Sequence, residues 1–496
     1  MEIHSPEFKD NARIALKDVS LQKALGNLRN GFPVKRAAAV ARMPEFEQLR
    51  NEARDLKNHV IENLDLYLEQ FEGKVLEQGG HVHWARDSKE ACEAILKICK
   101  DADAKTVTKG KSMVSEEINL NDYLEANGVQ PVETDLGEYI LQLRGDHPSH
   151  IIAPAIHLNL DDVSDIFAEK HGTPRTDDPA ELMQEAREML RKQFVAADVG
   201  ITGANFCVAE TGGTLIVTNE GNGDLTQTLP RVHVVITTID KMVPTLEDMT
   251  LFQRLLARSA TGQEFTVYNT LSTGPRRDGD QDGPDEFHVV LLDNGRSEMI
   301  GTEFQDMLRC IRCSACMNHC PVYGAVGGHA YGWVYPGPMG SVLTPELIGI
   351  DKAGHLPNAS TFCGKCESVC PVKIPLPKLM RHWREREFER HLSPKGFRFG
   401  LGVWAKFAKN PKLYRWLARA SSFGLKTMAG KKGRINSLPL GKGWTAWRDM
   451  PAPQGGTFMD QWKQPRTPHS AISSPDTKLD TRADNNNNNN NNNKGS

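Results

Sequence analysis

The chain has 496 residues, of which 39% are hydrophobic and 25% charged, which suits a protein of about three domains with more than one apolar core. Its formal net charge of -3 argues against a generic nucleic-acid-binding protein, and no run of about 18 apolar residues predicts a transmembrane helix. Residues 1–10 do not resemble a signal peptide, so we expect a cytoplasmic protein whose cysteines stay reduced.

Residues 1–73 are expected to form a helical region. Apolar side chains recur at three- and four-residue spacing between Phe46 and Phe71, which predicts one long amphipathic helix over residues 44–73. Pro44 suits the first turn of this helix, and Gly73 is expected to end it. A helix of this kind usually packs on a neighbouring element and has no further function.

Residues 74–300 alternate short strand-like runs with helical patterns. We predict strands at residues 74–76, 106–108, 214–218 and 232–237, and a helix at residues 180–195. Such alternation is typical of an α/β domain with a largely parallel sheet.

Two turns of this region could hold an anion or could be ordinary turns. Residues 109–112 read Lys-Gly-Lys-Ser but lack the spacing of a P-loop. Residues 209–214 lead directly into a predicted strand, and Glu210 is there either a candidate base or a simple capping residue. No glycine-rich dinucleotide fingerprint follows a predicted strand, so nothing supports a nucleotide cofactor.

Seven of the ten cysteines fall between residues 310 and 370, and they form two runs. The first run has the C-x2-C-x2-C-x3-C-P pattern of bacterial ferredoxins, in which the fourth cysteine binds the neighbouring cluster. Its cysteines are Cys310, Cys313, Cys316 and Cys320. The second run, which lacks a leading cysteine, contains Cys363, Cys366 and Cys370.

The crossed rule predicts two iron–sulfur clusters in residues 301–385. The first cluster would be bound by Cys310, Cys313, Cys316 and Cys370. The second would be bound by Cys320, Cys363 and Cys366. This second cluster is one thiolate short: it is either a [3Fe–4S] cluster, or a [4Fe–4S] cluster whose fourth ligand is Ser360, a water, or an atom of a substrate or partner. Zinc also binds paired cysteines, but two C-x3-C-P endings fit two cubes better.

His329 lies between the two cysteine runs, in a glycine-rich stretch over residues 327–332. Glycines of this kind allow close approach of the backbone to a cluster or to another segment. His329 could serve as a ligand or proton relay, or it could be an ordinary loop residue.

Residues 386–465 form a basic region. Residues 395–448 contain 13 Lys and Arg and no Asp or Glu, with a helix predicted to begin at Asn410 and Pro411. This segment could dock an acidic partner, lie on an anionic membrane surface, or simply be a solvated basic face. Residues 466–496, which include nine consecutive asparagines at 485–493, are expected to form a disordered tail.

Several segments together resemble the lactate utilization protein B family over roughly residues 10–460. They are residues 133–139, 148–154, 209–212, 272–277 and 291–296, and the two cysteine runs with residues 327–332 between them. The family is the iron–sulfur subunit of a three-protein bacterial system that oxidises L-lactate to pyruvate. The resemblance implies a lactate-utilization domain related in fold to the ribose-phosphate isomerase and coenzyme A transferase group, a two-cluster ferredoxin-type domain and a helical C-terminal region.

The resemblance also implies partners and site residues. The partners would be a cysteine-rich iron–sulfur subunit and a smaller subunit with its own lactate-utilization domain. A glutamate comparable to Glu210 lies at the working edge of the sheet in this fold. Family members also lack the leading cysteine at the position of Ser360, whereas the asparagine run departs from the family.

Three functions follow as alternatives. The first is an electron-transfer subunit of a non-flavin L-lactate dehydrogenase complex, which passes electrons through two clusters to a partner or the quinone pool. The second places the 2-hydroxy acid in the α/β domain, with Glu210 as the base and Lys109, Lys111 or Arg231 holding the carboxylate. The third is a module that docks on a partner or, at the inner face, on the membrane.

Overall fold

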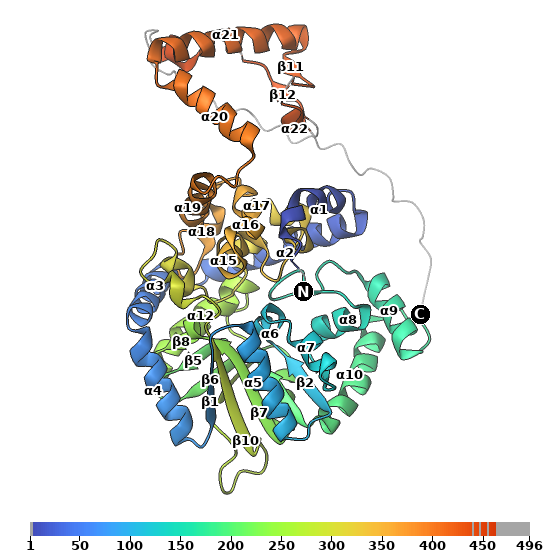
Figure 1. Ribbon diagram of the computed structural model, residues 1–496. Coiled ribbons are helices and arrows are strands. Elements are labelled where there is room, and N and C mark those ends of the chain that lie inside the picture. Colours follow the sequence, from blue (N-terminus) through green and yellow to red (C-terminus); the bar gives the residue numbers. More distant parts are fainter. Residues whose placement is uncertain (1–2, 439–440, 446–447, 454–455, 463–496) are drawn as a thin grey trace, which may run out of the picture. The chain divides into compact units, whose positions relative to one another are not determined.

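The computed structural model describes residues 3–438, 441–445, 448–453 and 456–462, and the chain divides after Ser393 into two compact units (Figure 1). The predicted disordered tail, residues 466–496, lies outside the described residues. Among the described residues, no helix is both long and apolar enough to cross a bilayer.

The larger unit is built on a six-stranded sheet in which all neighbouring strands are parallel. Across the sheet the strands are β1 (His81–Ala85), β10 (Glu286–Leu292), β7 (Val232–Thr238), β4 (Val199–Thr202), β2 (Thr106–Gly110) and β3 (Gln130–Glu133). The predicted strands at 106–108 and 232–237 are thus confirmed as parts of β2 and β7.

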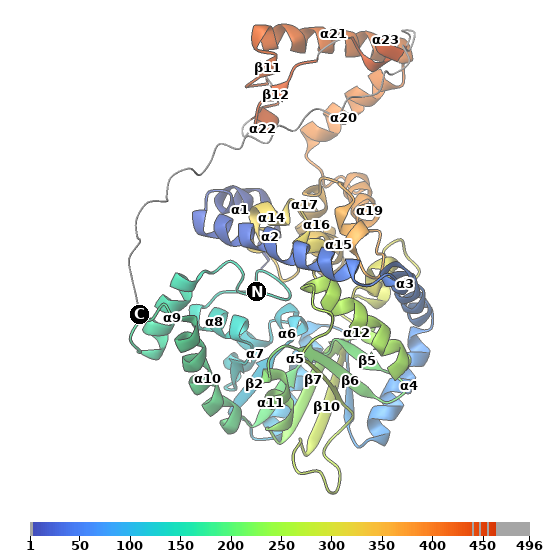
Figure 2. The ribbon, with the colours of Figure 1, turned by 180° about the vertical axis from the view of Figure 1, so that it is seen from behind.

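The central strands are buried on both faces because their side chains alternate between two cores. On one face Val234 and Ile236 of β7 pack with helix α5 (Ser88–Asp101). On the other face Val235 of β7 packs with helix α4 (Leu64–Glu77) and a second sheet. Figures 1 and 2 show these two faces in turn.

The remaining helices of the α/β part connect or flank these strands. They are α6 (Met113–Glu117), α7 (Leu120–Ala126), α8 (Leu136–Arg144), α9 (Leu160–His171), α10 (Pro179–Ala196), α11 (Asn222–Thr228) and α12 (Leu246–Ala260). The helix predicted at 180–195 is confirmed as α10.

The second sheet has four short strands and is mixed rather than parallel. Its order is β8 (Met242–Val243), β5 (Phe206–Val208), β6 (Gly213–Thr218) and β9 (Tyr268–Ser272). The predicted strand at 214–218 is confirmed as β6, but β6 pairs antiparallel with both of its neighbours. The domain therefore combines a parallel sheet with a small mixed one.

The N-terminal region is helical, but its long helix is divided. It consists of η1 (Ser5–Glu7), α1 (Phe8–Ala15), α2 (Val19–Ala41), α3 (Phe46–Glu62) and α4. The chain leaves helical geometry at Asn63, with φ -126° and ψ 35°, so the single helix predicted over 44–73 is wrong. The strand predicted at 74–76 is also wrong: Phe71 and Val75 continue the helical spacing of α4 into the core, and Gly73 lies inside that helix.

The cysteine-bearing part of this unit consists of short helices joined by tight turns. They are η3 (Ser297–Met299), η4 (Gln305–Arg309), α13 (Ala315–Asn318), α14 (Tyr323–Val326), η5 (His329–Tyr331), α15 (Gly337–Ile348), α16 (Ile350–Ala353), α17 (His355–Asn358), α18 (Lys365–Val369) and α19 (Leu376–Glu389). Trp383 of α19 donates a hydrogen bond to the Val342 carbonyl oxygen of α15 at 2.9 Å and is buried. This segment shares one apolar core with α3, α12 and the small sheet.

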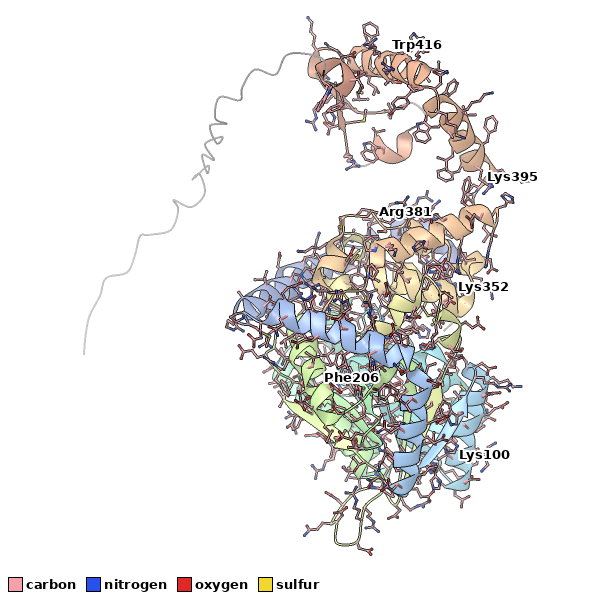
Figure 3. The ribbon with its side chains drawn as sticks, turned by 90° about the vertical axis from the view of Figure 1, so that its left-hand side faces the viewer. Lys100, Phe206, Lys352, Arg381, Lys395 and Trp416 are labelled. Atoms are coloured by element: carbon pink, nitrogen blue, oxygen red, sulfur yellow. The ribbon has the colours of Figure 1, made fainter. Side chains whose placement is uncertain are left out.

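The smaller unit contains two longer helices and several short elements. They are α20 (Lys395–Ala408), α21 (Pro411–Ala429), η6 (Gly430–Lys432), β11 (Arg434–Ile435), α22 (Lys442–Thr445), β12 (Met450–Pro451) and α23 (Phe458–Trp462). Asn410 caps α21 by accepting a hydrogen bond from the N–H of Lys412 at 3.2 Å, which confirms the predicted helix start. Trp416 of α21 is 64% exposed (Figure 3).

Candidate functional site

Four cysteines line one small cavity. They are Cys310, Cys313, Cys316 and Cys370. Arg312 and Ser314 adopt positive φ angles of 58° and 59°, so the backbone of the first run turns sharply between its cysteines. The rest of the wall is mainly apolar and includes Ile151, Met339 and Leu376.

Two thiols of this group, those of Cys313 and Cys370, are buried and resist ionisation. Burial raises the pKa of Cys370 to about 11. Burial raises the pKa of Cys313 as well, and the neighbouring Cys370 adds to that effect. Because thiolates rather than thiols bind iron, these cysteines keep their protons until a metal supplies positive charge. Four converging cysteines, two of them buried, with an apolar surround fit a [4Fe–4S] cube.

The other three cysteines form a second group. Burial raises the pKa of Cys366 to about 12, with contributions from the thiols of Cys320 and Cys363. Cys363 is exposed, whereas Cys366 is buried. Cys316 of the first group interacts with Cys366 as well as with its own neighbours. The two groups are therefore adjacent, and the second one reaches the surface.

Ser360 lies at the start of the loop that carries Cys363. Its Oγ accepts a hydrogen bond from the N–H of Phe362 at 3.2 Å. Its carbonyl oxygen accepts one from Arg384 Nη2 at 2.8 Å, and that guanidinium lies 4.0 Å from the ring centroid of Phe362. These contacts hold Cys363 in place without a fourth cysteine.

Arginines from the N-terminal helices hold the second cysteine run. Arg36 of α2 donates to the Val369 carbonyl oxygen at 3.0 Å. Arg50 of α3 donates to the Cys370 carbonyl oxygen at 2.7 Å. Both guanidinium groups are largely buried, so they also place positive charge close to thiolates that would bind iron.

A cavity of about 260 Å³ lies where the carboxyl ends of parallel strands face the first cysteine run. Its walls come from the segments that follow β2, β4 and β6, together with Arg312 and Tyr335. Strands β2 and β4 are neighbours in the sheet, although β3 comes between them in the sequence. This edge is therefore a topological switch point, the usual ligand-binding place of an open α/β sheet.

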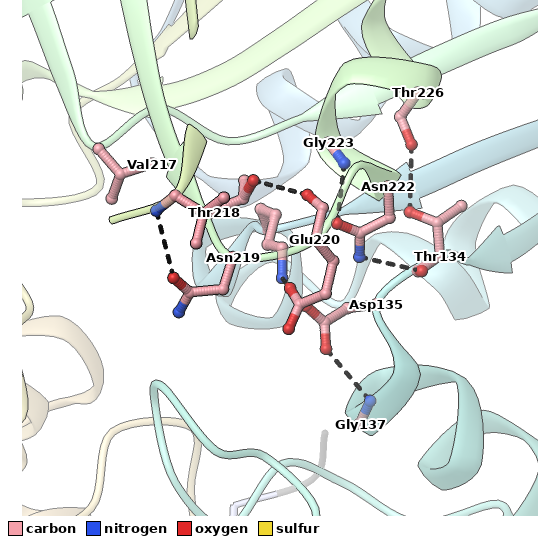
Figure 4. Close-up of polar contacts among 12 residues, drawn as sticks. Thr134, Asp135, Gly137, Val217, Thr218, Asn219, Glu220, Asn222, Gly223 and Thr226 are labelled. Atoms are coloured by element: carbon pink, nitrogen blue, oxygen red, sulfur yellow. Dashed lines mark hydrogen bonds and ion pairs between the residues drawn. The ribbon is translucent and has the colours of Figure 1, made fainter. Parts of the chain in front are cut away.

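Polar contacts join the loops around this cavity (Figure 4). Lys111, after β2, forms ion pairs with Asp135 and with Glu220, the latter at 3.0 Å. Asn222 donates a hydrogen bond to the Thr134 carbonyl oxygen at 3.1 Å. The loops after β2, β3 and β6 are thus fixed to one another.

Glu138 and Lys241 have perturbed ionisation in this cavity. Glu138 Oε2 is buried and has no hydrogen-bond partner among the described residues. Burial raises the pKa of Glu138 to about 7; Glu133 raises it further, and Lys111 opposes the change. Burial, followed by the charge of Arg312, lowers the pKa of Lys241 to about 8. A carboxyl group that titrates near neutral pH beside cations has the properties of a general base.

Arg312 connects this cavity to the first cysteine group. Its side chain is hydrogen-bonded to Cys310. Its guanidinium lies 5.1 Å from the ring centroid of Tyr335 and 3.9 Å from the carboxylate of Asp240. A molecule bound in the cavity would meet the same arginine that contacts a cysteine of the first run.

The catalytic set predicted around Glu210 is not brought together. Glu210 is exposed in the turn between β5 and β6, and its Oε2 accepts a hydrogen bond from the N–H of Leu246 at 3.1 Å. It therefore caps α12, which corresponds to the simpler of the two predicted roles. The cavity lies at the far end of β6, where Val217 and Thr218 line it, about 20 Å along the strand from this turn.

Two of the predicted carboxylate-binding cations also lie outside the cavity. Lys109 is 1% exposed, and its Nζ lies 2.8 Å from Glu116 and 2.7 Å from Glu133. Arg231 precedes β7, at the amino edge of the sheet, and pairs with Glu286. Only Lys111 of the predicted set lines the cavity.

The sequence reasoning missed Glu138, Lys241, Arg312 and Tyr335. Arg312 lies inside the first cysteine run, and Glu138 lies within residues 133–139, which contributed to the family resemblance. Neither position carries a signal for a shared site, because 173 residues separate the two in the sequence. Only the fold places both on one cavity.

Comparisons with known proteins match these two parts of the chain. The LUD domain family matches residues 68–292, and the 4Fe-4S dicluster domain family matches residues 306–374. A lactate utilization protein B of Geobacillus kaustophilus is 44% identical over 476 residues, which cover 94% of this chain and 98% of the relative. The protein of that name from Bacillus licheniformis is 43% identical with the same coverage.

Among solved structures, a DUF162 family protein of Deinococcus radiodurans matches with 15% identity and a TM-score of 0.27, covering 46% of this chain and 98% of that one. The sequence relatives, in contrast, align over nearly their full length. The chain, with its LUD domain and its 4Fe-4S dicluster domain, therefore belongs to the lactate utilization protein B family.

Proposed function

We propose that this protein is the iron–sulfur electron-transfer subunit of a system that oxidises L-lactate to pyruvate, with one cluster on each cysteine group. The observation that carries the proposal is the arrangement of the cysteines. Four of them surround a buried cavity, and three others form an adjacent group that reaches the surface at Cys363. When bound, each cluster would take up and release one electron.

The exposures of the two cysteine groups favour electron transfer from the first group, beside the cavity, to the second group, which reaches the surface. Cys313 and Cys370 are buried next to the cavity at the sheet edge, whereas Cys363 is accessible to another protein. Phe362, beside Cys363, is 40% exposed and could form part of the contact with a partner. The partners we propose are a cysteine-rich iron–sulfur subunit and a smaller LUD-domain subunit, with onward transfer to them or to the quinone pool.

Iron and acid-labile sulfide analysis of the anaerobically purified chain, with EPR spectra before and after dithionite reduction, tests this proposal. We expect about eight iron and eight sulfide per chain for two [4Fe–4S] clusters, with a non-cysteine ligand completing the second. About seven iron, with an oxidised [3Fe–4S] signal, would mean that the second cysteine group holds a [3Fe–4S] cluster and that Ser360 supplies no fourth ligand. Zinc without sulfide would overturn the electron-transfer function.

A second function is favoured by the cavity itself: binding of the 2-hydroxy acid beside the first cysteine group. Lys241 and Arg312 would hold the carboxylate, and Glu138 would accept the hydroxyl proton. Calorimetric titration of the intact protein with L-lactate tests this function. We expect Arg312→Gln to abolish the binding heat and Glu210→Gln, the matched control outside the cavity, to retain it. Equal binding by both variants would refute the assignment.

The side chains of the smaller unit favour peripheral binding to a membrane surface. Its helices carry exposed aromatic side chains among basic ones, including Phe399, Trp404 and Phe423 at 75%, 60% and 71% exposure. We propose that α20 and α21 hold this otherwise cytoplasmic protein against an anionic membrane. The fraction of protein that sediments with anionic liposomes should fall as the salt concentration rises, and Trp404→Ser should lower this fraction. Equal sedimentation with neutral liposomes would contradict this role.

A further inference from the structure

A third cavity, of about 480 Å³, lies outside the sites described above. It opens between the loop that follows α8 and the glycine-rich segment at residues 327–332. Asp146, His147, His157 and His329 line it, together with His4 and Glu7 from the N-terminal region. Neither cysteine group contributes to its lining, and the proposed electron-transfer function does not use it.

Three side chains converge in this cavity. Asp146, His157 and His329 each place a potential ligand atom within 4.8 Å of the other two. His157 Nε2 lies 3.1 Å from Asp146 Oδ2, and His329 Nε2 lies 3.7 Å from Asp146 Oδ1. The centroids of the two imidazole rings are 4.4 Å apart. Two nitrogens and a carboxylate at this spacing form one face of a coordination sphere.

Hydrogen bonds hold both imidazoles in place. His157 Nδ1 lies 2.8 Å from Ser149 Oγ, and that hydroxyl donates to the Pro154 carbonyl oxygen at 3.2 Å. In the tautomer with its proton on Nδ1, His157 donates to Ser149 Oγ and presents the lone pair of Nε2 to the Asp146 carboxylate. In that tautomer a cation between His157 Nε2 and Asp146 Oδ2, which lie 3.1 Å apart, would bind both acceptor atoms. His329 Nε2 contacts the His147 carbonyl oxygen at 2.8 Å, so an ion bound by His329 is held either through Nδ1 or through Nε2 in place of this contact.

The backbone holds this constellation in advance of any ligand. A Cβ at Gly328 would lie 1.8 Å from the Ser149 carbonyl oxygen, so only glycine allows the two loops to meet there. Tyr323 OH donates to the same carbonyl oxygen at 2.8 Å. His329 is thus fixed beside Asp146 and His157 by contacts that involve none of the three side chains.

We propose that Asp146, His157 and His329 bind a divalent transition-metal ion, of the Zn²⁺ or Fe²⁺ class. Two imidazoles and one carboxylate suit such ions, whereas Mg²⁺ and Ca²⁺ prefer oxygen ligands throughout. The adjoining cavity leaves coordination positions open to water or a small ligand. The ion also ties the loop after α8 to the segment between the two cysteine runs.

Zinc titration of the anaerobic, cluster-loaded full chain tests the proposal. We expect one zinc per chain in addition to the clusters, with micromolar or tighter affinity. Zinc-edge X-ray absorption should give only nitrogen and oxygen neighbours at about 2.0–2.1 Å, whereas zinc on stray cysteines would give sulfur at about 2.3 Å. No zinc uptake, or sulfur ligation alone, would overturn the proposal.

Variants separate the site from its surroundings. His157→Gln should weaken zinc binding at least a hundredfold while iron and sulfide content stay unchanged. His147→Gln, in the same cavity but outside the ligand set, should bind zinc like the unaltered protein. If His157→Gln does not fold, Ser149→Ala, which removes only the orienting hydroxyl, should weaken binding about tenfold. Unchanged affinity in the folded His157→Gln or Ser149→Ala variant would refute the assignment.

Discussion

Replacing Glu138 with Gln should stabilise the protein in a pH-dependent way. Burial of the Glu138 carboxyl group, with Glu133 nearby, raises its pKa from 4.5 to about 7. The folded chain therefore holds this proton more tightly than the unfolded chain does. The corresponding stability is fully present below pH 4.5 and is lost as the pH rises through 7.

The size of the effect follows from the pKa shift. Ionising a carboxyl group whose pKa is raised this far costs the folded state about 3 kcal/mol. A folded unit of this size unfolds with an entropy near 0.8 kcal/mol per kelvin, so the cost corresponds to about 4 °C in thermal midpoint. Because glutamine has no proton to lose, Glu138→Gln should avoid this cost at high pH.

Thermal unfolding of the cluster-loaded protein at pH 5 and at pH 8.5 measures the difference. We expect nearly equal midpoints for the unaltered protein and Glu138→Gln at pH 5, and a midpoint about 4 °C higher for the variant at pH 8.5. Glu138→Asp, which keeps a buried carboxyl group, should retain the pH dependence. A midpoint difference that is the same at both pH values would refute the reasoning.

Three further predictions concern the cysteine groups and the core beside them. Cys310→Ser and Cys370→Ser should alter one and the same EPR signal, and Cys320→Ser and Cys363→Ser the other; a signal shared by Cys363 and Cys370 would refute the crossed assignment. Arg312→Gln removes a positive charge beside Cys310. Redox titration should therefore show the potential of one cluster falling by on the order of 50 mV. An unchanged potential would contradict a cluster bound by Cys310. Glu117 lies 2.6 Å from Arg296 in a fully buried ion pair and accepts a 2.6 Å hydrogen bond from Tyr335. Glu117→Gln should therefore lower stability by about 3–5 kcal/mol, read as a lower thermal midpoint, and an unaltered midpoint would show that the pair contributes nothing.

The local patterns in the sequence predicted several elements and the chemistry of the cysteines. β-branched runs predicted β2 and β7 because a strand buried on both faces needs apolar side chains on both. The cysteine spacing predicted an iron–sulfur cofactor because three thiols in one tight loop can approach the same cube. These signals are short-range, so they survive without knowledge of the fold.

Other features escaped the sequence because they depend on contacts between distant segments. The helical spacing of Phe71 and Val75 was consistent with a longer α4, but their packing beneath the sheet decided between helix and strand. The motif around Glu210 suggested a site residue. The turn that carries Glu210, however, lies at the opposite end of β6 from the cavity.

The sequence by itself therefore determined that cysteine sulfur binds the cofactor and which segments of the chain carry those cysteines. What only the tertiary structure decided is which residues share a site. Glu138 and Arg312 line one cavity, and Asp146 and His329 another, although 173 and 182 residues separate the members of each pair. The physical reason is that burial and charge, which set the pKa of Glu138 and the alignment of His157, arise from neighbours that only chain folding brings close.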